Sequence, residues 1–172
     1  IWRGPMVMSA IEQLLRDVDW QDLEILIIDM PPGTGDAQLT LSQRVKLAGA
    51  IIVSTPQDLS LIDARKGLNM FKKVNVPILG IIENMSYFVC SNCEKKHPIF
   101  GNGGAKIEAD KLGVPCLDEI PLDIKLRTTS DEGKPIVEEE PDHIISQKYM
   151  DIGSRIIEMI IKNKKVSPVI TQ

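Results

Sequence analysis

The chain has 172 residues, of which 43% are hydrophobic, so it can bury one core, and we expect a single domain over residues 1–172. Its formal net charge of −4 and aromatic content of 4% argue against a nucleic-acid coat, which needs concentrated basic charge and rings that stack on bases. No apolar run approaches the length of a membrane span, so we expect neither nucleic acid nor a membrane as a partner. Three cysteines without secretory features indicate a reducing compartment, and the expected location is the cytoplasm.

Apolar periodicity divides the chain into alternating helices and strands. Apolar residues at spacings of three and four predict amphipathic helices, and continuous aliphatic runs predict strands that are buried on both faces. The expected helices cover residues 6–18, 36–48, 60–74 and 103–113, and a last one is marked by Ile145, Tyr149, Ile152, Ile156 and Ile160. The expected strands cover residues 24–29, 49–55, 76–84 and 114–121. This alternation predicts an α/β fold, with a doubly wound, mostly parallel sheet and helices on both faces.

Local signals mark several boundaries between these elements. Asp36 is expected to be the N-cap of the helix that starts there, and Gly113 is expected to end the helix before it. Residues 85–99 form a cysteine-bearing insert after the third strand. Residues 163–172 are expected to be a frayed, solvated tail.

The segment Ile25–Asp36 carries the first functional hypothesis. Asp29 ends the predicted strand, where this architecture places its ligand, and in a P-loop nucleotidase an aspartate there holds Mg²⁺. Prolines stiffen the turn Pro31-Pro32-Gly33-Thr34-Gly35, and its glycines let backbone N–H groups approach an anion such as a γ-phosphate. The turn is therefore predicted to be a switch that senses the γ-phosphate. The alternative is a stiff strand-to-helix turn with two capping acids.

Five unusual segments together carry a family resemblance. They are WQDLEILIIDMPPGTGD, STPQDLSLIDARKGLNMF, GIIENMSYFVCSNC, HPIFGNGGA and IPLDIKLRTTSDEGKPIV, in this order. Over roughly residues 2–160 the chain resembles the Mrp-type iron–sulfur cluster carrier ATPases, relatives of the MinD/ParA and nitrogenase-iron-protein nucleotidases. It departs from that family at Glu24 and Ile25, where an aspartate and an aromatic residue or valine are usual. It also departs at Ser91, where proline is common.

One motif of that family is missing from the sequence. A GxxxxGK[ST] phosphate-binding loop does not occur, because Lys134 follows Gly133 but Pro135 comes next. We expect the amino-terminal portion of the nucleotide-binding domain, with its phosphate cradle, to precede these residues. The chain is then a partial domain and is inactive as an ATPase by itself.

The resemblance implies a pocket for ATP at the ends of the third and fourth strands. It implies that Asn84 hydrogen-bonds the adenine base, which suits the paired donor and acceptor of an amide. Pro121 and Asp123 would line the base pocket, and Arg127 and Asp131 would support their loop. The alternatives are an asparagine that caps a strand-to-loop turn and charged residues that are simply solvated.

Cys90 and Cys93 form one CxxC pair within the insert, while Cys116 is expected to be a small buried residue of a strand. Structural zinc and 4Fe–4S sites both need four ligands, and one chain offers a single pair at chelating spacing. The resemblance implies a homodimer in which Cys90 and Cys93 of each subunit hold a bridging, solvent-accessible 4Fe–4S cluster. Zinc bound by Cys90, Cys93 and His97 with a fourth ligand from elsewhere ranks second, and a redox-active thiol pair ranks third. His97 alone is expected to be a solvated loop residue.

The resulting hypothesis is an ATP-dependent iron–sulfur cluster carrier. The full-length protein would be an ATPase that uses ATP and Mg²⁺, receives a cluster from a donor and passes it to recipient apoproteins. One alternative is a non-catalytic zinc or scaffold module. Another is a partitioning ATPase of the ParA/MinD kind, which leaves the CxxC pair unexplained.

Overall fold

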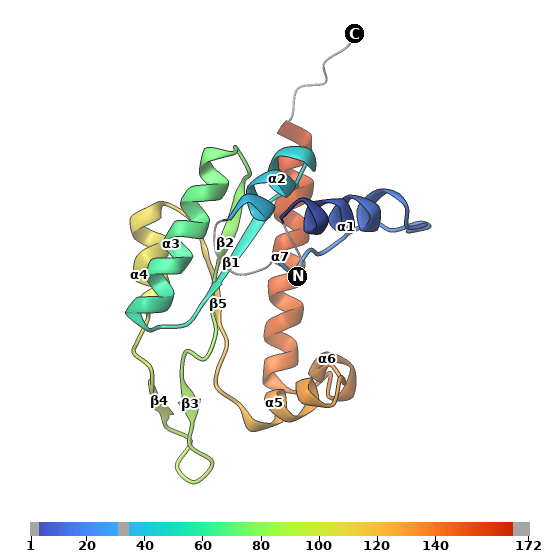
Figure 1. Ribbon diagram of the computed structural model, residues 1–172. Coiled ribbons are helices and arrows are strands. Elements are labelled where there is room, and N and C mark those ends of the chain that lie inside the picture. The colour runs from blue at the N-terminus through green and yellow to red at the C-terminus, as the bar shows by residue number, and fades with distance from the viewer. Residues whose placement is uncertain (1–3, 31–34, 167–172) are drawn as a thin grey trace.

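The computed structural model describes residues 4–30 and 35–166 of the chain (Figure 1). A parallel sheet lies at its centre, in which β1 (Ala50–Ser54), β2 (Ile78–Glu83) and β5 (Cys116–Glu119) are arranged in the order β1-β2-β5. Each of these strands falls inside one of the predicted strand segments. Helices alternate with the strands and lie on both sides of the sheet (Figure 1), which confirms the predicted α/β fold class.

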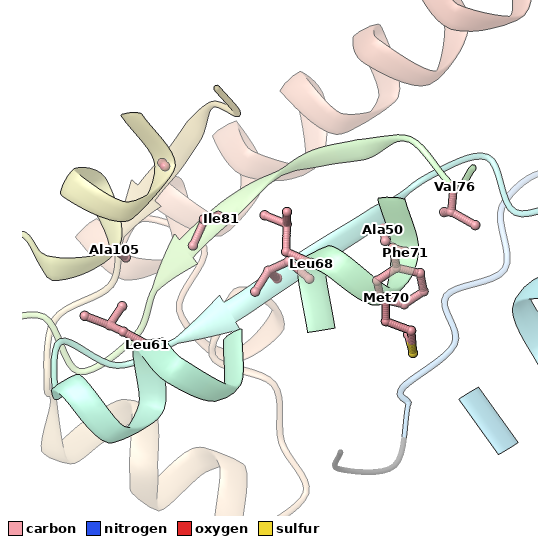
Figure 2. Packing of buried hydrophobic residues seen from close by; sticks show 10 residues of the cluster. Ala50, Leu61, Leu68, Met70, Phe71, Val76, Ile81 and Ala105 are labelled. Atoms are coloured by element: carbon pink, nitrogen blue, oxygen red, sulfur yellow. The ribbon is translucent and has the colours of Figure 1, made fainter. Parts of the chain in front are cut away.

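One face of the sheet is covered by α3 (Asp58–Lys73) and α4 (Gly104–Leu112). Leu61, Leu68 and Phe71 lie on one side of α3 because they are spaced by seven and three residues, and they pack into the cluster of Figure 2 that also holds Ile81 of β2. Leu68 is completely buried, and burial of such a side chain stabilises the fold by about 1.5–3 kcal/mol.

The other face is covered by α7 (Ile144–Val166), so the last predicted helix is part of the core. Its residues Ile145 and Ile152 are buried against Ile120, which follows β5. Polar contacts also tie α7 to β5, since the Lys148 Nζ donates to Asp118 Oδ1 at 2.7 Å. The chain between the two elements forms the short helices α5 (Ile124–Asp131) and α6 (Ile136–Glu139), which periodicity does not predict because neither carries a repeated apolar pattern.

The two first helices, α1 (Gly4–Arg16) and α2 (Asp36–Arg44), pack together, and Arg44 of α2 forms an ion pair with Glu12 of α1. The predicted N-cap of α2 is wrong by one residue. Gly35 occupies that position in an extended conformation, and no side chain accepts a hydrogen bond there. Glycine is tolerated at an N-cap, so the helix starts with Asp36 as its first residue.

Residues 24–29 do not form a strand, so the prediction of a buried strand there is wrong. Ile25 and Leu26 are exposed, and Ile27 is 86% exposed. An aliphatic run becomes a buried strand only when neighbouring strands accept its backbone hydrogen bonds and helices cover its two faces. Within residues 4–30 and 35–166, no strand pairs with this segment.

Burial on both faces is also wrong for β1, which is one of the two outer strands in the described order β1-β2-β5. Ile52 is buried, whereas its neighbour Val53 points the other way and is 61% exposed. The strand packs against α3 on one face, and its alternate side chains remain open on the other.

The last helix also ends later than expected. Helix α7 continues to Val166, past Asn163, where we expected a frayed tail to begin. Residues 167–172 lie outside the described residues. No helix in the described part of the chain is both long and apolar enough to cross a membrane.

Two leucines of α3 provide a matched test of this core. Leu68→Ala is expected to lower the free energy of unfolding by about 2–5 kcal/mol, because it removes most of a fully buried side chain and leaves a cavity in its place. Leu59→Ala makes the same change at a position that is 75% exposed, and we expect a change within about 0.5 kcal/mol. Urea denaturation measures both values, and equal losses would contradict the packing described here.

Candidate functional site

The carboxyl ends of the parallel strands open onto a cavity of about 420 Å³. Asn84 follows β2, and Pro121 and Asp123 follow β5, so the sheet brings these three predicted residues to one edge. The lining is Asn84, Met85, Phe88, Pro121, Leu122, Asp123, Ile124, Leu126, Arg127, Ser130 and Tyr149. Most of these side chains are apolar, so the cavity offers a flat apolar ligand a few polar groups for orientation.

The side chains of Asn84 and Asp123 hold the turns that shape this cavity. The Asn84 Oδ1 accepts a hydrogen bond from the N–H of Met85 at 2.9 Å, and Met85 has a left-handed φ of 54°. Asp123 is the N-cap of α5, and its Oδ1 accepts from the N–H groups of Lys125 and Leu126 at 2.7 and 2.9 Å. Both residues therefore have local structural roles at the rim of the cavity.

Glu83, the last residue of β2, is a buried polar residue that the sequence analysis missed. Its side chain is completely buried, and both carboxyl oxygens accept short hydrogen bonds. Oε1 accepts from the hydroxyl of Ser86, and Oε2 accepts from the N–H of Ala105 in the first turn of α4, each at 2.6 Å. Since the cysteine-bearing insert lies between Ser86 and Ala105, this carboxyl group holds both of its ends. The only sequence signal was an acid at the end of an aliphatic run.

The insert itself forms a small antiparallel hairpin (Figure 1). Its strands are β3 (Phe88–Val89) and β4 (Lys96–His97), and Phe88 lies opposite His97. Cys90 closes the turn between them, because its carbonyl accepts from the N–H of Glu94 at 2.8 Å and its own N–H donates to the carbonyl of Lys95 at 3.0 Å. The hairpin tip is therefore ordered by its own backbone and is exposed to solvent.

Three metal-binding side chains meet at this hairpin. The sulfur atoms of Cys90 and Cys93 and a ring nitrogen of His97 all lie within 4.8 Å of one another. The sequence predicts that Cys90 and Cys93 form a pair at chelating spacing, and their sulfur atoms do lie close together. It also predicts that His97 alone is a solvated loop residue, and the residue is exposed, but its ring lies beside the two thiols. Spacing alone does not predict this contact, because the pairing of β3 with β4 is what returns the histidine to the thiols.

The two kinds of cysteine differ in their electrostatic surroundings. Hydrogen bonds from the backbone N–H groups of Asn92 and Cys93, and then from the Cys93 side chain, lower the pKa of the Cys90 thiol. Burial, and then the charge of Glu119, raises the pKa of the Cys116 thiol. Cys90 is thus prepared to act as a thiolate ligand, whereas Cys116 packs beside the core as expected.

Backbone hydrogen bonds connect the hairpin to the cavity. The N–H of Leu122 donates to the carbonyl of Tyr87 at 2.7 Å, and Phe88 forms a parallel bridge with Leu122. Phe88 both lines the cavity and pairs with His97. A ligand in the cavity therefore contacts a residue whose partner lies beside the two thiols.

Of the residues predicted to bind Mg²⁺ and phosphate, the two that the structure describes, Asp29 and Gly35, do not line this cavity. Asp29 is exposed and lines a different hollow of about 440 Å³, together with apolar residues of α1 such as Ile11 and Leu15. Gly35 is the N-cap of α2. Pro31, Gly33 and Thr34 lie outside the described residues.

Two further lining residues are Arg127, which the sequence predicts near this loop, and Tyr149, which it does not. Arg127 forms an ion pair with Asp131, and both side chains are exposed, so they behave mainly as surface charges. Tyr149 reaches the cavity from α7, and burial raises the pKa of its phenol. Its place in an apolar helical pattern gave no sign of this role.

The family of the chain follows from a comparison with known proteins. Residues 1–157 match the ParA family model, described as the NUBPL iron-transfer P-loop NTPase. The chain belongs to this NUBPL iron-transfer P-loop NTPase family. This result confirms the family predicted from the five segments.

Two relatives show what share of a longer protein this chain matches. It is 56% identical over 160 residues to the iron-sulfur cluster transfer protein NUBPL of Dictyostelium discoideum, covering 93% of this chain and 50% of that protein. It is 50% identical over 156 residues to the iron-sulfur cluster carrier protein of Haemophilus influenzae, covering 91% of this chain and 42% of that protein. The chain therefore spans about half the length of these relatives or less.

A solved structure of a similar protein has the same fold as this chain. This structure is the nucleotide-binding protein of Archaeoglobus fulgidus in complex with ADP, in which cobalt was found. It superposes on this chain with a TM-score of 0.70 at 42% sequence identity. The match covers 81% of this chain and 57% of that one.

Glu83→Gln tests the anchoring of the hairpin. We expect a loss of about 1 kcal/mol in the free energy of unfolding, because an amide offers one acceptor oxygen where the carboxyl group offers two, so the hydroxyl of Ser86 must give up the hydrogen bond that it donates. Amide hydrogen exchange between Ser86 and Ala105 should become faster. Glu119→Gln makes the same change at the end of the neighbouring strand, and equal effects of the two variants would contradict an anchoring role.

The pKa of Cys90 predicts the pH dependence of its alkylation in the metal-free protein. Since a lowered pKa preserves the thiolate at lower pH, the pH at which Cys90 reacts with iodoacetamide at half its maximal rate should lie below that of an ordinary cysteine thiol. The corresponding pH for Cys116 should lie above that of an ordinary thiol. Peptide mass spectrometry of timed samples gives both profiles.

Cys93→Ser is the matched control for this profile. It keeps the backbone N–H groups of Asn92 and Cys93, the two largest causes of the shift, so the midpoint for Cys90 should stay low. The same midpoint for Cys90 and Cys116 would contradict the lowered pKa of Cys90 and the raised pKa of Cys116.

Proposed function

We propose that the protein is an ATP-dependent carrier of iron–sulfur clusters. The observation that carries this proposal is the pair of thiols at the tip of an exposed hairpin, in a chain of the iron-transfer family. The names of the Dictyostelium and Haemophilus relatives support a role in cluster transfer and carriage. In this proposal a donor protein supplies the cluster and recipient apoproteins receive it, in the cytoplasm.

The proposed cargo is a 4Fe–4S cluster held between two copies of the protein. Such a cluster needs four thiolates, and Cys90 and Cys93 from each of two chains supply that number. Exposed apolar side chains of Val89, Ile99 and Phe100 lie near the pair in sequence and suit a subunit contact around the cluster. Exposure of the hairpin also suits a cargo that must leave for another protein.

The cavity beside the hairpin is proposed to bind the base of ATP. The residues present fit this group, since Met85, Phe88 and Leu126 offer apolar surface, and Asn84 adds an amide that can pair with a base edge. The ADP in the Archaeoglobus structure supports a nucleotide ligand. Pro121 and Asp123 shape the rim of the cavity, as described above.

Hydrolysis is proposed for the whole protein and not for this chain alone. Asp29 would hold Mg²⁺, which neutralises phosphate charge when bound, and the turn Pro31–Gly35 would contact the γ-phosphate. The sequence contains no lysine-bearing phosphate loop, so we propose that this chain by itself is inactive as an ATPase. The bonds that join Leu122 to Tyr87 would transmit occupancy of the cavity to the hairpin.

A zinc-binding or scaffold module is the second candidate, and the position of His97 beside the thiols favours it. A partitioning ATPase of the ParA/MinD kind gives the thiols no role, and it ranks third.

Anaerobic reconstitution with iron and sulfide tests the carrier proposal. We expect broad visible absorption and roughly four irons per pair of chains, both lost in the Cys90→Ala, Cys93→Ala double variant. Cys116→Ala is the matched control, and it should keep the cluster because that thiol packs beside the core. Cluster that persists in the double variant, or a dimer that takes up only zinc, would overturn the proposal.

A further inference from the structure

His97 adds a third candidate metal ligand to the two thiols of a single chain. A shared cluster takes four thiolates from two chains and needs no histidine. In the structure, however, the ring of His97 lies within 4.8 Å of both sulfur atoms of its own chain. Three ligand groups of two kinds are thus already assembled without a partner.

The hairpin backbone explains why this histidine is held in place. His97 lies opposite Phe88 in the ladder of β3 and β4, and Cys90 follows Phe88 by two residues, on the same side of an extended chain. The carbonyl of His97 accepts from the N–H of Ile99 at 3.0 Å, which fixes the residue on its other side. Lys96, the neighbouring cation, lies over the ring of Tyr87 at 4.4 Å from its centroid.

The distances suit one transition-metal ion. Tetrahedral zinc with bonds of about 2.3 Å to sulfur and about 2.0 Å to nitrogen places its ligands roughly 3.6–3.8 Å apart. The three ligand atoms here lie within 4.8 Å of one another, and small rotations of exposed side chains close that difference. Thiolate and imidazole together select ions such as Zn²⁺ and Co²⁺ over Mg²⁺ and Ca²⁺.

We propose that each single chain binds one divalent transition-metal ion of the Zn²⁺ class through Cys90, Cys93 and His97, with the fourth position open to solvent. Three protein ligands and an open position are the arrangement of an exchangeable site and not of a closed structural one. The ion uses both thiolates, so it excludes the shared cluster from the same chain. This exclusion rests on the proposed carrier function, whereas the metal site itself does not.

Titration of the metal-free protein with Co²⁺ under anaerobic conditions tests the site. We expect one Co²⁺ per chain, sulfur-to-cobalt charge-transfer bands and the intense d–d bands of tetrahedral geometry, without a change in molecular mass by light scattering. His97→Ala should weaken binding at least about tenfold and move the d–d bands, because it removes one ligand of the ion. The double cysteine variant should lose the charge-transfer bands.

The second histidine supplies a matched control. His143→Ala removes an imidazole that lies before α7, where its Nδ1 accepts from the N–H of Ile145, and it should bind Co²⁺ like the parent protein. Equal affinity and equal spectra for His97→Ala and the parent protein would overturn the proposal. Binding of one Co²⁺ per two chains, with a doubled mass, would also overturn it.

Cluster reconstitution of His97→Ala separates this inference from the carrier function. The cluster should form in this variant with the iron content of the parent protein, since histidine is not one of its ligands. If no variant takes up a cluster while Co²⁺ binding still depends on His97, the carrier proposal fails and the metal site stands. If the cluster forms but His97→Ala binds Co²⁺ as tightly as the parent protein does, the metal site is wrong and the carrier proposal stands.

Discussion

The hydrogen bonds of the Glu83 side chain are the constraint on which the geometry of both candidate sites depends. A buried carboxyl group is costly unless its oxygens find donors, and here the hydroxyl of Ser86 and the first turn of α4 provide them. The acid therefore forces the two ends of the insert to meet at the end of β2. Together with the hydrogen bond from the N–H of Leu122 to the carbonyl of Tyr87, this contact fixes the place of the hairpin relative to the sheet.

The same strand end places Asn84 at the cavity, one residue after the anchor. The carbonyl of Glu83 also accepts from the N–H of Ile120 at 2.8 Å, which fixes the segment that leads to Pro121 and Asp123. Cavity and hairpin are thus built on a common backbone frame and not on two independent loops. In the proposed function, this shared backbone would be the path that couples nucleotide binding in the cavity to the cluster on the hairpin.

The sequence predicted those parts of the fold whose partners lie within the chain. The aliphatic runs of β2 and β5 became strands because each has a neighbouring strand and a covering helix. The equally aliphatic residues 25–28 did not, since burial is a property of the surroundings and not of the run itself. Spacing likewise identified Cys90 and Cys93 as a pair, but His97 and Glu83 joined the sites only through strand pairing and tertiary contacts, which no local pattern encodes.

The aliphatic run at residues 25–28 is exposed at Ile25, Leu26 and Ile27. An unpaired, apolar segment without proline or charge is the composition that nucleates sheet formation between molecules and leads to aggregation. Acids flank the run on both sides, with Asp22 and Glu24 before it and Asp29 after it. Because charges beside an apolar run oppose its pairing with a second molecule, these three acids would limit aggregation of a chain in which the run is exposed.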